Sequence, residues 1–157
     1  MTLQDVIQRP ILDLLPHAPP MALLDRATYI SEDEFESEVV IRPDSEFCDG
    51  EKVGSWVGIE YMAQSIAAFA SAEAVLKGES VKVGFLLGSR EYRCKTPYFK
   101  VGAALRIRVK KVIHDPNGLS VLECSLSQAG QAEAEVVSNL TVYEVPDLQS
   151  YLKENVT

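Results

Sequence analysis

Histidine and cysteine, the residues that supply most zinc ligands and all disulfides, are scarce in this sequence of 157 residues. There are two histidines and three isolated cysteines: His17, His114, Cys48, Cys94 and Cys124. No two of the cysteines form a C-x-x-C pair, so neither a zinc site nor a disulfide framework is indicated. Isolated cysteines favour a reducing compartment, and we expect no metal and no other cofactor.

The motifs that mark nucleotide-binding sites and serine hydrolases are missing as well. The sequence has no G-x-S-x-G, no G-x-G-x-x-G and no phosphate loop. Its net charge of −8 argues against nucleic-acid binding, because a polyphosphate backbone is usually bound by a basic face. The N-terminus lacks a basic region followed by an apolar run, so no signal peptide is predicted and the expected location is the cytoplasm.

Charge is spread unevenly along the chain. Residues 32–51 contain nine acidic side chains, whereas residues 90–111 contain eight basic ones against Glu91 alone. One interpretation is that these are solvated strand faces that discourage pairing at sheet edges. The other is that the basic segment docks an acidic partner.

The most distinctive stretch is residues 56–76, which is rich in alanine and apolar almost all round. It predicts one long helix, with Ser55 as its N-cap and Gly78 just past its end. A helix without a polar face must be buried. A membrane span is disfavoured because Glu60 and Gln64 lie inside the helix and no second span follows.

The rest of the chain predicts a short N-terminal helix, broken by Pro10 and Pro16, and a series of strands. The expected strands are residues 22–31, 34–42, 81–87, 91–94, 104–113, 119–128 and 132–143, and a short surface helix is expected over 147–153.

This order of elements indicates an α+β protein with a single domain over residues 1–157, in which an antiparallel sheet curls around the central helix. One sheet cannot cover such a helix on all sides, so we expect at least a dimer.

Two ionisable residues stand out by position. His17 lies in a proline-rich segment that is held extended, and Glu60 lies about one turn inside the apolar helix. Burial raises the pKa of a carboxyl and lets it donate a proton, and a neutral histidine can accept one. Equally, His17 can be a surface residue and Glu60 can simply complement the helix dipole. Gln64 lies on the same helix face as Glu60, where it either orients the carboxyl or satisfies a buried polar neighbour.

Two motifs carry a resemblance to a known family. Residues 15–26, LPHAPPMALLDR, resemble the L-P-H-x-x-P-x-x-L-[LV]-D-R segment of the Z-type 3-hydroxyacyl-acyl-carrier-protein dehydratases. Residues 59–64, IEYMAQ, resemble the I-E-A-M-A-Q stretch on their central helix. Residues 84–97 look like the segment that follows that helix, and the similarity covers roughly residues 11–143.

The resemblance implies a hot-dog fold and dimers whose two helices pack together inside a continuous sheet. It implies that His17 removes the α-proton of a 3-hydroxyacyl thioester and that Glu60 protonates the leaving hydroxyl, with the two residues coming from different subunits. The product would be a trans-2-enoyl thioester. The thioester carbonyl would accept hydrogen bonds from the backbone around Ser55 and Trp56, at the start of the helix.

The sequence departs from the family before the helix. Residues 45–47 stand where the family has G-H-F-P, and residues 53–55 stand where it has M-P-G, so that Ser55 replaces a glycine. Trp56 and Tyr61 add aromatic bulk beside the predicted site. The predicted substrate contacts are Ser55, Trp56, Tyr61 and Gln64.

These departures resemble a branch of small hot-dog proteins from aryl-polyene and other type II polyketide-like pathways, some of which pair with a second hot-dog chain. An acyl carrier protein would then dock on the basic segment, through Arg90, Arg93 and Lys95. Two alternatives remain: a non-catalytic partner subunit of a hot-dog heterodimer, and a hot-dog acyl thioesterase.

Overall fold

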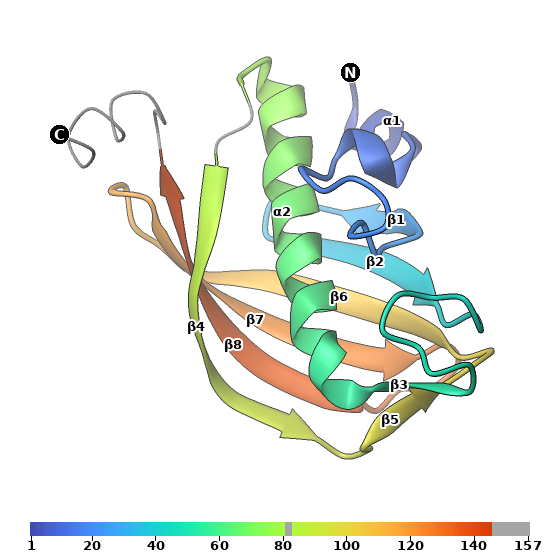
Figure 1. The fold of residues 1–157 in the computed structure, drawn as a ribbon. Helices are drawn as coiled ribbons and strands as arrows, with labels where there is room; N and C mark the ends of the chain where they lie inside the picture. The colour runs from blue at the N-terminus through green and yellow to red at the C-terminus, as the bar shows by residue number, and fades with distance from the viewer. Residues whose placement is uncertain (81–82, 146–157) are drawn as a thin grey trace, which may run out of the picture.

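One long helix lies within a curled antiparallel sheet (Figure 1). The computed structural model describes residues 1–80 and 83–145, so the helix predicted over residues 147–153 lies outside the described residues. The helix is α2 (Gly58–Lys77), and the sheet has the strand order β1-β2-β6-β7-β8-β4. Its strands are β1 (Arg26–Ile30), β2 (Glu34–Val40), β4 (Val83–Cys94), β6 (Ala104–His114), β7 (Leu119–Gln128) and β8 (Val136–Val145). The sheet curled around one helix is as predicted.

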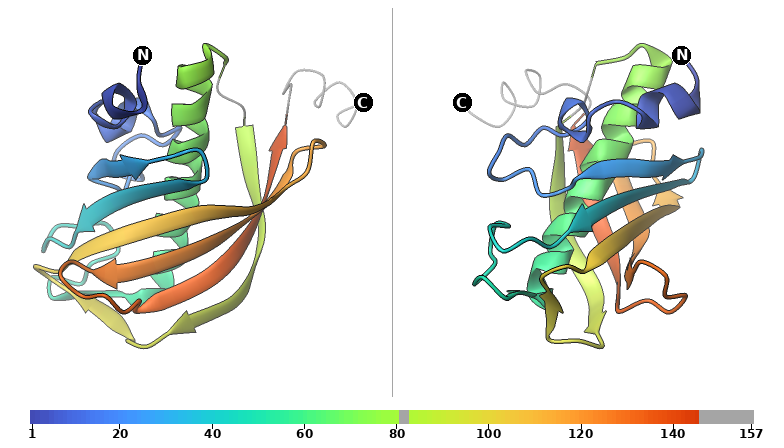
Figure 2. Two further views of the ribbon diagram at one scale, coloured as in Figure 1. Left: turned by 180° about the vertical axis from the view of Figure 1, so that it is seen from behind. Right: turned by 90° about the vertical axis from the view of Figure 1, so that its right-hand side faces the viewer.

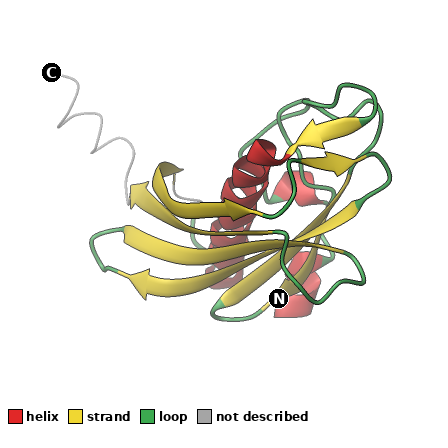
Figure 3. Ribbon diagram, turned by 90° about the horizontal axis from the view of Figure 1, so that it is seen from below, coloured by secondary structure: helices red, strands yellow, loops and turns green. Residues whose placement is uncertain are grey.

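Smaller elements close the two ends of this arrangement. The helix α1 (Leu3–Ile7) and the 3₁₀ turn η1 (Ile11–Asp13) precede the sheet, and α1 lies on the same side of it as α2 (Figure 3). Two short strands, β3 (Lys52–Gly54) and β5 (Tyr98–Lys100), pair with each other outside the main sheet. The 3₁₀ turn η2 (Ser55–Val57) joins β3 to α2.

The two ends of α2 differ in how well the sequence predicted them. Gly78 adopts a left-handed conformation with φ of 67°, and its N–H donates to the carbonyls of Ala74 and Val75, as expected of a terminating glycine. The predicted N-cap at Ser55 is wrong. Ser55 begins η2, and α2 itself begins at Gly58 without a side-chain cap.

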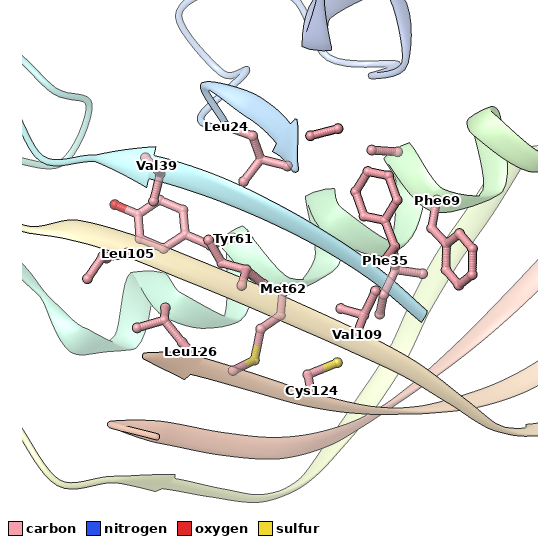
Figure 4. Close-up of a cluster of buried hydrophobic side chains, with 14 of the residues drawn as sticks. Leu24, Phe35, Val39, Tyr61, Met62, Phe69, Leu105, Val109, Cys124 and Leu126 are labelled. Atoms are coloured by element: carbon pink, nitrogen blue, oxygen red, sulfur yellow. The ribbon is translucent and has the colours of Figure 1, made fainter. Parts of the chain in front are cut away.

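The core lies between α2 and the inner face of the sheet. Along β6 the residues alternate, with Leu105, Ile107 and Val109 fully buried. Phe35 of β2 stacks on Phe69 of α2 with 5.6 Å between the ring centroids (Figure 4). Burying each such side chain contributes roughly 1.5–3 kcal/mol to stability, so this interface is what holds the helix against the sheet.

Residues 1–80 and 83–145 leave one stripe of α2 without a cover. Its members are half-buried, and from Glu60 onward they recur every three or four residues: Ile59, Glu60, Ala63, Ala67 and Ala70. The prediction that the helix is buried all round is therefore not met by one chain alone, and a second chain would be needed to complete it. None of the helices within residues 1–80 and 83–145 is long and apolar enough to cross a membrane.

The uneven charge of the sequence is partly resolved by strand pairing. The acidic strand β2 runs beside the basic strand β6, and Glu36 lies opposite Arg108. On the outer face Arg108 contacts the Glu34 carboxylate at 2.6 Å, and Arg26 contacts that of Glu38 at 3.1 Å. The charged residues of β2 and β6 thus lie on solvated strand faces, as the first interpretation has it, but both strands are interior and do not form sheet edges. The acidic residues after Val40 lie in the loop that follows β2.

The strand bounds differ from those predicted. The described part of the stretch expected at 81–87 and the stretch expected at 91–94 belong to one strand, β4, which is interrupted by a bulge between Arg90 and Arg93. Within the part of the chain that the structure describes, this strand pairs with β8 alone, and β4 and β1 form the two edges of the sheet (Figure 2). The pair β3 and β5 was not predicted, because three residues are too few to give a periodic pattern.

Candidate active site

His17 and Glu60 face each other within one chain. The segment between η1 and β1 passes over the first turns of α2, and it brings Nε2 of His17 to 3.8 Å from Oε1 of Glu60. This separation exceeds that of a hydrogen bond. The two side chains are 31% and 38% exposed, so both are open to a ligand.

A buried amide holds this arrangement. Gln64 is fully buried, one turn after Glu60, and its Nε2 donates to Oε1 of Glu60 at 3.0 Å and to the carbonyl of Met21 at 2.7 Å. Its Oε1 accepts the N–H of Leu23 at 2.8 Å. The N–H of Leu23 needs the amide oxygen as its acceptor, whereas the Met21 carbonyl and the Glu60 carboxylate need the amide nitrogen as their donor. The orientation of the Gln64 amide is therefore fixed. Gln64 therefore ties the segment that carries His17 to the helix that carries Glu60.

The structure differs here from what the resemblance implied. The histidine and the acid were expected from different subunits, yet the chain brings both together by itself. The physical reason is the amide of Gln64, which anchors the backbone at Met21 and Leu23 directly on α2. The expected burial of Glu60 is also not met by the chain alone, because Glu60 lies on the half-buried stripe of the helix.

The two ring nitrogens of His17 have different surroundings. Nδ1 is buried and has no hydrogen-bond partner among the described residues, whereas Nε2 points toward Glu60. Nε2 is therefore the nitrogen that can exchange a proton with a ligand.

Backbone N–H groups at the start of the helix can bind a carbonyl oxygen, but one of the two predicted groups is already engaged. The N–H of Ser55 donates to the Pro97 carbonyl at 3.0 Å, so it is already engaged. The first N–H groups of a helix have no partner within it. Of the two predicted donors, this leaves the N–H of Trp56. The side chain of Trp56 is 69% exposed and lies over Gly54.

The sequence missed Tyr92, which lies beneath the same turn. Its hydroxyl donates to the Ser55 carbonyl at 2.5 Å. Burial, together with the nearby Cys94 thiol, raises the pKa of Tyr92, so its hydroxyl remains a donor. Nothing in the local pattern distinguished this tyrosine from its neighbours in the basic segment.

Tyr61 follows Glu60 but points elsewhere, because neighbouring residues on a helix are about 100° apart. Its ring lies in the core beside Val39 and Leu105 (Figure 4), and burial raises the pKa of Tyr61 to about 12. The Tyr61 side chain also lines a cavity of about 240 Å³ with Pro20 and Leu23. Its predicted contact with substrate would have to come from that side.

The three predicted docking residues lie at the end of β4 and are all exposed. Arg93 pairs with Glu91 at 3.1 Å, and Lys95 pairs with Glu133 at 2.8 Å. Such exposed pairs exchange readily with solvent and with other partners. Arg90, Arg93 and Lys95 therefore remain available to an acidic surface.

Comparisons with known proteins agree with this architecture. A chain of the dehydratase heterocomplex ApeI:P from Xenorhabdus doucetiae is 27% identical, with a TM-score of 0.82 over 94% of this chain and 98% of that chain. A thioesterase from Haemophilus influenzae is 16% identical, with a TM-score of 0.62 over 92% of this chain and 91% of that chain. A hypothetical thioesterase from Streptococcus pneumoniae, solved with coenzyme A, is 11% identical, with a TM-score of 0.58 over 76% and 84%.

The two thioesterases share the fold alone, and the fold is the hot-dog fold that the resemblance implied. No curated protein sequence matches the chain. The model of the ApeP-like family, described as ApeP dehydratase, matches residues 9–153. The match spans most of the chain and includes both His17 and Glu60, and the chain belongs to the ApeP-like dehydratase family.

Proposed function

We propose that this chain dehydrates 3-hydroxyacyl thioesters to trans-2-enoyl thioesters, with His17 and Glu60 as its acid–base pair. The observation that carries the proposal is the 3.8 Å approach of Nε2 of His17 to Oε1 of Glu60, close to the start of α2. Two groups this close can act on adjacent carbon atoms of one substrate. The membership of the family adds support, since the family is named for dehydratase activity.

In the proposed reaction, Nε2 of His17 takes a proton from C2 of the thioester, and the electron pair of that bond moves to the carbonyl oxygen. The N–H of Trp56, at the positive end of the helix, donates to this developing enolate. The electron pair then returns to form the C2–C3 double bond. The C3–O bond breaks, and the hydroxyl leaves as water with the proton of Glu60.

At the end of this cycle His17 carries the extra proton and Glu60 is ionised. Their proximity lets the proton return from the imidazole to the carboxylate, which restores both groups. The cycle begins with a protonated Glu60. An acyl chain lying across Glu60, or a second protein chain covering the half-buried stripe of α2, would exclude water, and desolvation favours the neutral form of a carboxyl.

The proposal includes a second hot-dog chain, either another copy or a different one. The half-buried stripe of α2 lacks a cover, and the edge strand β4 exposes Phe85, Leu86 and Leu87. An apolar edge strand of this kind invites pairing. The relative from Xenorhabdus doucetiae is part of a heterocomplex. Light scattering on the purified protein gives its mass in solution: a dimer would identify the partner as a second copy, and a monomer would leave a different hot-dog chain as the partner.

The substrate would be presented by an acyl carrier protein, in fatty-acid or polyketide-type synthesis that includes aryl polyenes. The exposed residues Arg90, Arg93 and Lys95 would form the docking surface for this acidic partner. A second candidate function is that of a non-catalytic subunit, and the exposure of Glu60 favours it. The thioesterase alternative has no comparable support, because the thioesterase structures share the fold alone.

Replacement of the two residues separates these possibilities. His17→Ala and Glu60→Gln should each slow the dehydration of a 3-hydroxyacyl carrier-protein substrate on the order of 10²–10⁴-fold, as expected for loss of an acid or a base. His114→Ala and Glu32→Gln are matched controls that change the same residue types at exposed positions, and they should retain full activity. Undiminished turnover in both His17→Ala and Glu60→Gln would refute the assignment. Release of free thiol without enoyl product would instead identify a thioesterase.

A further inference from the structure

A bulge in β4 turns Tyr92 toward the start of α2. The pairing of β4 with β8 shifts register between Arg90 and Arg93, and Glu91 within this bulge adopts a positive φ of 54°. A residue other than glycine adopts this conformation only at an energetic cost, and such strain concentrates at functional sites. Bulges also redirect individual side chains. Here the side chain that the bulge redirects is that of Tyr92, which is half-buried against the core.

The hydroxyl of Tyr92 is fitted closely into the start of the helix. It donates to the carbonyl of Ser55 at 2.5 Å. Residue 58 is a glycine, and a Cβ added there would overlap the Tyr92 hydroxyl. The next nearest atoms to that position are Cδ1 of Leu126 at 3.6 Å and Cζ of Tyr92 at 3.7 Å, which are ordinary contacts. Among the atoms that surround residue 58 in the described part of the chain, outside the backbone of α2 itself, the hydroxyl alone requires a glycine there.

Hydrogen bonds hold Ser55 in place at both its N–H and its carbonyl. Its N–H donates to the carbonyl of Pro97, just before β5, and its carbonyl accepts from Tyr92. The N–H of Gly58 also donates to the Ser55 carbonyl and closes the turn η2. With residue 55 held at both its N–H and its carbonyl, the peptide group that follows it has a fixed orientation. That peptide group contains the N–H of Trp56.

We propose that Tyr92 is a positioning residue, whose hydroxyl fixes the turn Ser55–Val57 so that the N–H of Trp56 is held ready for the thioester carbonyl of the substrate. This inference rests on the proposed function. Tyr92 does not touch the substrate and acts through the Ser55 carbonyl. A fixed donor stabilises developing negative charge more effectively than a mobile one, because it need not reorganise during the reaction.

The test begins with Tyr92→Phe, which removes the hydroxyl and keeps the ring. Loss of a donor itself costs on the order of 10²–10³ in kcat, and loss of its support should cost less, roughly 10-fold, with KM unchanged. Tyr29→Phe, at an exposed tyrosine on β1, is the matched control and should be neutral. A Tyr92→Phe variant with wild-type kcat, or with a raised KM and unchanged kcat, would overturn the proposal.

Gly58→Ala perturbs the same contact from the opposite side. In the wild-type background it should lower kcat, because the new methyl group displaces the hydroxyl. In the Tyr92→Phe background it should have no further effect, because only ordinary contacts then surround the methyl group. Additive losses in the double variant would mean that the two residues act independently, and would refute the proposal even if one single variant proved unstable.

A spectroscopic measurement distinguishes positioning from a merely structural role. A saturated acyl thioester without the 3-hydroxyl cannot be dehydrated, and the infrared stretch of its labelled carbonyl reports the hydrogen bond that it accepts. Tyr92→Phe should move this stretch toward the value of the free thioester, and an unchanged stretch would contradict the proposal. If the wild-type protein binds the thioester but dehydrates no substrate, the proposed function fails while the inference about Tyr92 remains open to test. The carbonyl stretch then still decides the role of Tyr92.

Discussion

Replacing Gln64 by leucine should both destabilise the protein and release the segment that carries His17. The side chain of Gln64 is fully buried and makes three hydrogen bonds, two of them to the backbone at Met21 and Leu23. Leucine has a similar volume but leaves those two backbone groups without a partner. A fully buried polar group without a partner costs about 1–3 kcal/mol. Both of these bonds are only partly buried, so we expect a cost in the lower half of that range for each group, roughly 3 kcal/mol in total in the free energy of unfolding. For a chain of this length that corresponds to about 6–12 °C in Tm.

The assay combines thermal unfolding with turnover. Phe69→Ala is the matched control, because it removes a fully buried ring from the far half of α2 and should cost a similar 3–5 kcal/mol by the rule for such truncations. If Gln64 holds the site together, Gln64→Leu should lose far more kcat than Phe69→Ala at 20 °C, where both remain folded. A Tm within about 2 °C of the wild type would refute the hydrogen-bond argument, and equal kcat losses in the two variants would refute the positioning argument.

Three further predictions concern the surface and the thiols. Replacing Arg90, Arg93 and Lys95 by glutamate should raise KM for a carrier-bound substrate far more than for a short thioester mimic. The control, replacement of Arg106 and Lys110 on β6 by glutamate, should not have this effect. Equal effects of the first change on both substrates would discredit the docking surface. In the native protein the exposed Cys94 should react with an alkylating reagent and the buried Cys124 should not, and mass spectrometry that finds Cys124 labelled before unfolding would contradict the structure. Burial raises the pKa of Cys124 to about 12, above the value of about 8.5 for a free thiol. Between about pH 9 and 12 only the unfolded chain therefore ionises this thiol, so the folded state should lose stability as the pH rises through that range.

Local signals account for what the sequence predicted well. The long apolar stretch and Gly78 indicated a buried helix and its end, and both depend on neighbouring residues only. Interruptions in the pattern account for the errors. Gly88 and the bulge at Glu91 split β4 into two predicted strands, because each breaks the alternation that identifies a strand.

The site was only partly predictable, because its contacts are between distant residues. The pair His17 and Glu60 was identified from residue type and resemblance, and Gln64 from its position four residues after Glu60. The bonds of Gln64 to the backbone at Met21 and Leu23 join segments more than 40 residues apart, which no spacing rule reveals. Tyr92 was missed for the same reason, since its partner Ser55 lies 37 residues away.

The in-chain pairing of His17 and Glu60 changes what a second chain would contribute. If the acid came from a partner, a partner without a matching glutamate could not support catalysis. Because this chain holds both groups 3.8 Å apart, the partner need only cover the half-buried stripe of α2 and exclude water from Glu60. A different hot-dog chain that lacks both residues can do this as well as a second copy can. Selection on such a partner would then act on its apolar face rather than on ionisable residues, and unlike chains could form a working pair with a single site.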